Sequence, residues 1–325
     1  MIVHPDLRAL RSDDAPQRDA QERLYRAVGT WRKTPAAAAV IADLAPYAEG
    51  RPLDDCAALA ALFDEGADLA LPLMQAFAAA AAEGLAEAPL GYLPLRHFSD
   101  GVISTLLIGH AGAVTLSLVA VDGAGLAARP SPMAVDFRPS EVAERVLAGS
   151  AQAELIACRP LGDRQAQLSR TAIALAPGRS IRRDGANTAM LLNAVSGCLV
   201  TLRLQRRRAD DCPTREYALA DGRLLHQAAS DPRDSRLELT MALLGRMGRA
   251  DAAPHFAGLA RGEGSTALRW QALRECLTLD TATGFAALTA MATSPGDPLA
   301  AMAGTLRAQL IETYPQLGAL EPCPA

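Results

Sequence analysis

Three histidines are the side chains of this sequence best suited to hold a metal ion. His97, His110 and His226 each offer an imidazole nitrogen, a ligand that suits divalent iron and other transition metals. A catalytic metal normally takes about three ligands from the protein, so the set is large enough if the fold brings its members together. The alternative for His226, in the segment DGRLLHQAAS, is a hydrogen-bonded histidine in a hairpin. No histidine stands between residues 111 and 225.

A group of arginines is the second candidate for chemistry, and it falls on a predicted hairpin: Arg182, Arg183, Arg203, Arg206, Arg207 and Arg208. A planar guanidinium holds a carboxylate or phosphate through two parallel hydrogen bonds, so the group predicts an anion-binding mouth. The alternative is a solvated edge whose charge is offset by Asp184, Asp210 and Asp211. The residues that we predict to bind a ligand are Arg182, Arg183, Asp184, Met190, Arg203 and His226.

A spaced motif lies in the segment from Ala176 to Leu204, APGRSIRRDGANTAMLLNAVSGCLVTLRL. Gly178 and Gly197 stand at its outer positions, with Asp184, Ala186 and Met190 between them. The spacing resembles the first motif of the cupin family, G-x5-H-x-H-x3-E-x6-G, in which the two histidines and the glutamate hold a metal. The resemblance implies a jelly-roll fold. Most of the metal ligands are missing here, because alanine has no donor atom and a thioether suits few metals.

Two functions follow from the resemblance and the missing ligands. The first is a metal-free cupin-like protein without a cofactor, which binds a small molecule in the jelly roll or a protein partner. The alternative that the resemblance leaves open is a metal-dependent oxygenase or isomerase acting on a small molecule. It would use divalent iron or another transition metal on His97, His110 and His226, with Asp184 as a further ligand.

The β-region that must position these residues is predicted over 96–232. Val200, Leu202 and Leu204 alternate with polar residues, as expected of a strand with one buried face. Further strands are predicted at 102–108, 113–121, 152–158 and 215–220, with Gly178 in a turn after one strand and Gly197 in a turn before the next. Many short strands separated by turns favour a β-sandwich or partly open barrel.

The region before the strands, residues 1–95, is predicted to be helical. Leu24, Ala27, Val28 and Trp31 form an apolar stripe within a helix over 17–33. Pro35 opens a second helix, and two more are predicted over 52–63 and 69–86. The last of these is apolar on most sides, so we expect it to pack against a larger body.

The C-terminal region, residues 233–325, is predicted to be a helical repeat. Asp251, Phe256 and Leu259 recur as Asp280, Phe285 and Leu288 at a spacing of 29 residues. A third, looser copy runs from Asp297 to about Tyr314, and each Asp is predicted to cap the second helix of its unit. The paired helices resemble HEAT-type repeats, which implies an α+β multi-domain protein with a concave surface for a protein partner.

The composition of the 325 residues is that of a folded protein, with 50% hydrophobic residues and a net charge of −4. The charge gives no support to a nucleic-acid partner. Residues 101–121 carry no formal charge, but the Gly-His-Ala-Gly turn at their centre predicts a buried hairpin and not a membrane span. The single lysine and the many alanines are typical of a GC-rich bacterial genome. Six cysteines without a C-x-x-C pair predict free thiols in the cytoplasm.

Overall fold

The computed structural model describes residues 10, 13–162, 164–208, 212–229 and 231–320. Two compact units make up the chain. Unit 1 contains Met1–Arg208 and Tyr217–Leu224, and unit 2 contains Ala209–Glu216 and Leu225–Ala325. His4, Asp210 and Asp211 lie outside the described residues.

Unit 1 is built on one antiparallel sheet in the order β1-β2-β3-β8-β5-β6, with β7 also paired to β5. The strands predicted at 102–108, 113–121 and 152–158 are present, and the last of them is part of a much longer strand. The bounds are β1 His97–Ser99, β2 Ile103–Ala111, β3 Val114–Asp122, β5 Ser140–Pro160, β6 Ala166–Leu175, β7 Ser180–Asp184 and β8 Thr188–Arg207.

The two motif glycines have different places in this sheet. Gly178 lies in the turn between β6 and β7 with a φ of +87°, as predicted. The prediction for Gly197 was wrong, because it lies inside β8 with a φ of +69°. Around it the register of β8 against β5 shifts, forming a β-bulge. Gly149 of β5 faces this bulge, also with a positive φ of +79°.

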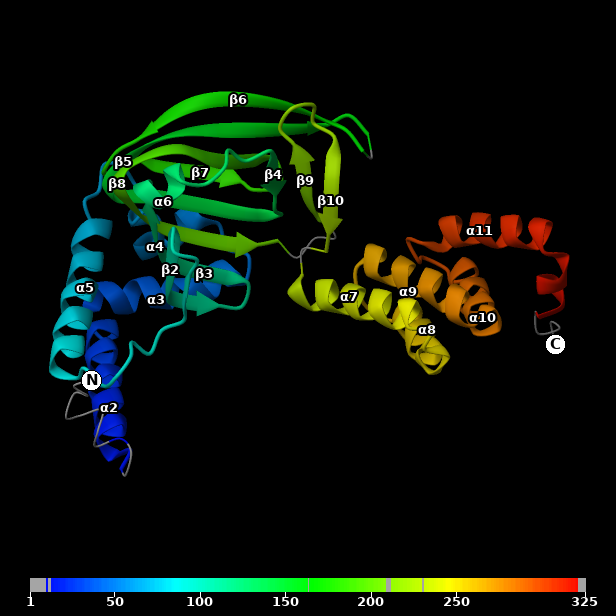
Figure 1. Ribbon diagram of the computed structural model, residues 1–325, viewed down its shortest axis with the longest axis horizontal. Helices are drawn as coiled ribbons and strands as arrows, with labels where there is room; N and C mark the ends of the chain where they lie inside the picture. Colours follow the sequence, from blue (N-terminus) through cyan, green and yellow to red (C-terminus); the bar gives the residue numbers. More distant parts are fainter. Residues whose placement is uncertain (1–9, 11–12, 163, 209–211, 230, 321–325) are drawn as a thin grey trace. The chain divides into compact units, whose positions relative to one another are not determined.

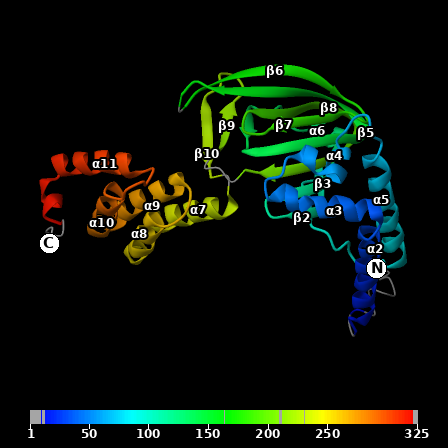
Figure 2. The same ribbon diagram turned by 180° about the vertical axis from the view of Figure 1, so that it is seen from behind.

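The helices that precede the sheet in the chain cover one of its faces (Figures 1 and 2). The short helix after β3 packs on the other face, where Leu126 joins the cluster of Val119 and Val121. Pro35 occupies the first turn of its helix, where its missing amide proton costs nothing. All four predicted helical segments are helical, and the segment over 52–63 divides into two short pieces. The bounds are α2 Ala15–Arg32, α3 Pro35–Ala48, η1 Leu53–Asp55, α4 Ala57–Ala61, α5 Ala70–Glu87 and, after β3, α6 Gly123–Ala127.

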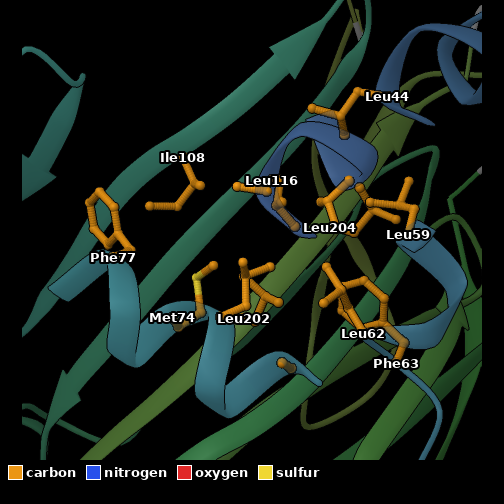
Figure 3. Packing of buried hydrophobic residues seen from close by; sticks show 14 of the residues in the cluster. Leu44, Leu59, Leu62, Phe63, Met74, Phe77, Ile108, Leu116, Leu202 and Leu204 are labelled. Atoms are coloured by element: carbon orange, nitrogen blue, oxygen red, sulfur yellow. The ribbon is translucent and has the colours of Figure 1, made fainter. Parts of the chain in front are cut away.

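The main core of unit 1 lies between these helices and the sheet. Figure 3 shows Leu44, Met74 and Phe77 from the helices beside Leu202 and Leu204 of β8. Phe77 also stacks edge-on against the ring of Trp31, with the ring centres 5.0 Å apart. The predicted packing of the apolar helix against a larger body is therefore confirmed. The domain boundaries at residues 95 and 232 stay predictions.

A second, three-stranded sheet has the order β10-β9-β4. Its strands are β4 Ala134–Phe137, β9 Thr214–Ala218 and β10 Leu224–Ala228, so the strand predicted at 215–220 is present. Tyr217 is fully buried in unit 1, where its ring meets Phe137 edge-on at 5.9 Å. Ile156 of β5 belongs to the same apolar cluster.

Unit 2 is a set of helices around its own core, which includes both repeat phenylalanines, Phe256 and Phe285. Asp280 caps α10 through the amides of Ala282 and Thr283, as predicted, whereas Asp251 pairs with Arg249 and caps no helix. The bounds are α7 Pro232–Arg246, η2 Ala250–Ala252, α8 Ala253–Arg261, α9 Thr266–Leu279, α10 Thr281–Ala292, α11 Ala300–Thr313 and η3 Pro315–Leu320.

The uncharged segment at 101–121 forms the hairpin of β2 and β3 and not a helix. In the part of the chain that the structure describes, every helix is too short or too polar to cross a membrane.

Candidate functional site

The sheet face turned away from the helices is polar along β8. Because successive side chains of a strand point to opposite faces, Leu202 and Leu204 join the core while Arg203 and Gln205 lie on the other face. Register places Arg203 between Ser117 of β3 and Glu144 of β5. The strands therefore hold this arginine at the middle of the polar face.

Glu144 ties two arginines together on this face. Its Oε2 accepts a hydrogen bond from Arg183 Nη2 at 2.8 Å, and its Oε1 accepts one from Arg203 Nε at 2.5 Å. The Glu144 side chain is only 3% exposed, against 14% for Arg183 and 36% for Arg203. Burial opposes ionisation of Glu144, but Arg203 and Arg183 outweigh it and lower the pKa of the carboxyl. Two cations share one carboxylate, so the cluster carries an excess positive charge.

A cavity of about 360 Å³ lies beside this cluster, and we call it the arginine cavity. It brings together three of the six residues predicted to bind a ligand: Arg183, Met190 and Arg203. Its lining is Ala134, Val135, Asp136, Arg138, Ser140, Val142, Arg183, Gly185, Thr188, Ala189, Met190, Leu191, Arg203 and Gln205. The cavity thus combines a guanidinium pair with hydroxyl and amide groups and an apolar wall.

The donors of the two arginines are only partly used. The Nε of Arg203 donates a hydrogen bond to Glu144, and the described residues offer its two Nη atoms no acceptor. The Nε of Arg183 is buried and likewise has no hydrogen-bond partner among them. The paired Nη groups of a guanidinium match the two oxygens of a carboxylate or phosphate. The geometry therefore suits an anion.

A second cavity of about 290 Å³ adjoins the first, since Arg203 and Gln205 line both. His97, Phe98 and Ser117 are among its other lining residues. His97 is exposed on the short strand β1. This places one of the predicted histidines at the edge of the polar face, next to an arginine.

Of the other predicted ligand residues, Arg182 and Asp184 line a different cavity of about 570 Å³, which Arg183 also lines. Arg182 forms an ion pair with Asp54 at 2.5 Å. Asp184 caps the turn between β7 and β8 through the amide of Ala186 and the side chain of Asn187. His226 belongs to β10 and to unit 2. The five predicted residues of unit 1 are therefore divided between two cavities, and Arg183 lines both.

Arg206 lines a cavity with Arg182 and Arg183, but its donors are used by groups of the fold itself. Its Nη1 donates to the carbonyl oxygens of Tyr47 at 2.7 Å and Arg51 at 2.9 Å, and its Nη2 donates to Glu141 at 2.5 Å. The guanidinium also lies 4.1 Å from the centre of the Tyr47 ring. Burial raises the pKa of Tyr47 to about 12. No local sequence pattern indicates this cluster, because its members come from distant segments. Arg182, Arg207 and Arg208 are the exposed members of the arginine group, as a solvated edge requires.

The residues at the metal-motif positions do not fit a metal centre. Of Asp184, Ala186 and Met190, only Asp184 offers a hard donor, and its oxygens accept hydrogen bonds from the turn. His97 pairs with Leu106 of the neighbouring strand β2. His110 lies four residues further along β2, which is about 13 Å in the direction of the strand. Within the described ranges, no group of three His, Cys, Asp or Glu side chains is placed to hold a metal ion.

Comparison with known proteins finds similar solved structures for part of the chain. No family model and no curated protein matches the sequence. Solved structures similar to it include the CENP-C cupin domain of Drosophila melanogaster, at 14% identity over 34% of this chain and 74% of that one, with a TM-score of 0.26. A cupin-superfamily sugar phosphate isomerase from Silicibacter pomeroyi has 15% identity over 36% and 66%, with a TM-score of 0.24.

A third similar structure is a cupin-superfamily protein from Desulfitobacterium hafniense, with 13% identity over 34% of this chain and 83% of that one and a TM-score of 0.22. These structures are cupin-superfamily proteins, found at low identity and partial coverage. The likeness covers about a third of the chain and carries no conclusion on activity.

Proposed function

We propose that unit 1 binds a small molecule carrying a carboxylate or phosphate in the arginine cavity. The observation that carries the proposal is the Arg203 guanidinium, whose Nε is fixed by buried Glu144 while its Nη atoms have no acceptor among the described residues. A fixed guanidinium loses little side-chain entropy on binding, which favours affinity.

Charge and shape support an anionic ligand of modest size. Asp136 forms an ion pair with Arg138 at 3.1 Å, so these two charges cancel. The net charge of the cavity is therefore the positive excess charge of the Glu144 cluster. A volume of about 360 Å³ is in the range of small-molecule sites. Val135, Val142 and Leu191 give the non-ionic part of such a molecule an apolar wall.

The cavity supports binding better than catalysis. Its lining has no histidine or cysteine, and its one carboxylate, Asp136, is engaged by Arg138. A general acid or base needs a titratable group free to exchange its proton. The metal-dependent oxygenase or isomerase is not part of this proposal, because His97 and His110 lie well apart.

The proposal also keeps the finer predictions about architecture. Unit 1 would be a jelly-roll-like ligand-binding unit, and unit 2 a HEAT-like array that offers a surface to a protein partner. Support for the repeat comes from Phe256 and Phe285, which stand 29 residues apart in the sequence and are both buried. A cytoplasmic location is supported by the free thiols of Cys56, Cys198 and Cys276.

Calorimetric titration of the full chain with benzoate and with inorganic phosphate tests the cavity and distinguishes the two anions. Benzamide, which has the shape of benzoate without its charge, is the ligand control. We expect one of the anions to bind, Arg203→Lys to weaken binding at least about tenfold through loss of the paired Nη donors, and Arg207→Lys to change nothing. Arg207 is exposed on the same strand and does not line the cavity.

Two results would overturn the proposal. One is the absence of binding heat for both anions at millimolar concentration. The other is an Arg203→Lys affinity equal to that of the unaltered chain, with both variants shown to be folded by circular dichroism.

A further inference from the structure

Helix α7 of unit 2 carries three large apolar side chains on its exposed side. Leu239, Leu243 and Met247 are 70%, 59% and 58% exposed. They follow one another at every fourth residue and so form one line along the helix and its C-cap. We call this line the α7 stripe. The other side of the helix packs into unit 2 through Met241, which is buried.

The exposed charged side chains of α7 on the side of the α7 stripe are all arginines. Arg233, Arg236 and Arg246 are exposed on the same side of the helix. The two acidic residues within α7 are turned toward unit 2, where Asp234 accepts a hydrogen bond from the amide of Ser265 and Glu238 accepts one from Ala229. The helix therefore separates its charges and presents a basic border around an apolar line.

We propose that the α7 stripe is the docking site for an acidic amphipathic helix of a partner protein. Such a helix would cover Leu239 and Leu243 with its own apolar side chains and place carboxylates against the three arginines. This inference rests on the part of the proposed function that gives unit 2 a protein partner, and it names the chemistry of that partner. It is independent of the arginine cavity.

Two other occupants fit the α7 stripe less well. A second copy of this chain docked through the same helix would bring arginines against arginines, which opposes association. A membrane-surface helix usually carries its cations on the face opposite its apolar residues, often with aromatic residues at the boundary. Here Arg236 lies among the apolar side chains, and the face opposite them is packed into unit 2.

The test uses a fluorescent synthetic peptide of roughly 18 residues, about five helical turns. Its leucines repeat at every third and fourth position, and glutamates flank them on both sides. A second peptide has lysine in place of each glutamate, and phosphatidylglycerol vesicles represent the membrane. Binding to the full chain is measured by fluorescence anisotropy for the peptides and by sedimentation for the vesicles.

We expect the glutamate peptide to bind and the lysine peptide and the vesicles not to bind. Leu243→Ser and Arg246→Glu should each weaken binding about tenfold. Matched controls are Met302→Ser, an exposed methionine on α11, and Arg159→Glu, an exposed arginine of unit 1. Both controls should leave the affinity unchanged.

The inference would be overturned by equal binding of the two peptides, by vesicle binding, or by a Leu243→Ser affinity equal to that of Met302→Ser. The benzoate and phosphate titrations of the same protein report on the arginine cavity separately. Failure at the α7 stripe is thus distinguished from failure of the proposed ligand site.

Discussion

Glu144 is the residue on which the polar face of the sheet depends. Its carboxylate is almost fully buried and accepts hydrogen bonds from both Arg183 and Arg203. Removing one partner of a buried ion pair leaves an uncompensated charge, and this costs more than the pair itself contributes. The cluster therefore fixes the position of the arginines as well as their charge.

Glu144→Gln should lower the free energy of unfolding by about 3 kcal/mol, because two guanidinium groups lose their common counter-ion. Urea denaturation followed by circular dichroism measures the change. Glu154→Gln is the matched control, since the pair of Glu154 with Arg170 is longer, 3.6 Å, and more exposed. That substitution should cost less than about 1 kcal/mol. Equal losses in the two variants would contradict this account.

The same carboxylate should make stability depend on acid pH. The pKa of Glu144 is lower in the folded protein than in the unfolded chain, so its contribution is complete above the unfolded value of about 4.3 and is lost as the pH falls through the folded pKa. The difference in unfolding free energy between the unaltered chain and Glu144→Gln should therefore narrow below about pH 4. Urea titrations at pH 7, 5 and 3 measure it. If this difference in unfolding free energy stayed constant with pH, the two arginines would not lower the pKa of Glu144.

Residue types alone predicted part of the candidate site. Arg183 and Arg203 stood out as arginines on a hairpin, and Met190 as a motif position. Glu144 did not stand out, because only the register of β5 against β8 places it opposite Arg203. Arg206 has the same residue type as Arg203 but faces the helices, and its partners come from residues 47–51.

The paired bulge in β5 and β8 is the main irregularity among the long strands. Gly149 and Gly197 both have positive φ, yet they differ in surroundings. A Cβ added at Gly149 would overlap the carbonyl oxygen of Cys198, whereas a Cβ at Gly197 would meet no atom within 4 Å. A substitution at Gly197 therefore introduces backbone strain alone, whereas one at Gly149 introduces both strain and steric overlap.

Gly197→Ala should cost about 1–2 kcal/mol, the price of a left-handed conformation for alanine. Gly149→Ala should cost about 3 kcal/mol or more, because overlap with the neighbouring strand adds to the same strain. Thermal and urea unfolding of the two variants measure the difference. Gly197→Ala serves as the matched control, and an equal loss in both would exclude steric overlap as a cause.

Elements marked by local signals were predicted well, and the long strands were not. A proline marked the start of α3, apolar periodicity marked α2, and a nearly continuous apolar composition marked α5. All three are short-range properties of the chain. The full lengths of β5 and β8 were missed, because a glycine within a strand looks like a break from sequence alone. Gly197 was for that reason assigned to a turn, when pairing across the sheet carries the strand through it.

At the scale of the whole molecule, each unit has its own apolar core. Phe77 is buried between helices and sheet in unit 1, and Phe285 is buried among the helices of unit 2. The two tryptophans are also divided, with Trp31 in unit 1 and Trp270 in unit 2. This division provides a separate optical probe for each unit.

We expect the units to respond separately to core substitutions. In a Trp270→Phe background, Phe77→Ala should destabilise the transition reported by Trp31 by about 3–5 kcal/mol. Phe285→Ala should leave that transition unchanged while it lowers the helical signal of unit 2. Fluorescence and circular dichroism during urea unfolding give the two midpoints. A shift of the Trp31 midpoint by Phe285→Ala would show that the units unfold together.

Residues 217–224 belong to unit 1 although they follow a segment of unit 2 in the sequence. This affects the order in which the chain can fold as it is synthesised. Tyr217 is fully buried beside Phe137 and Ile156, so unit 1 lacks part of its interior until this residue has left the ribosome. By then the segment 209–216, which belongs to unit 2, has already been made. Domains usually fold in order from the N-terminus during synthesis. In this protein the first unit cannot be completed before the second has begun to emerge, and a fragment ending at residue 208 would lack an interior side chain.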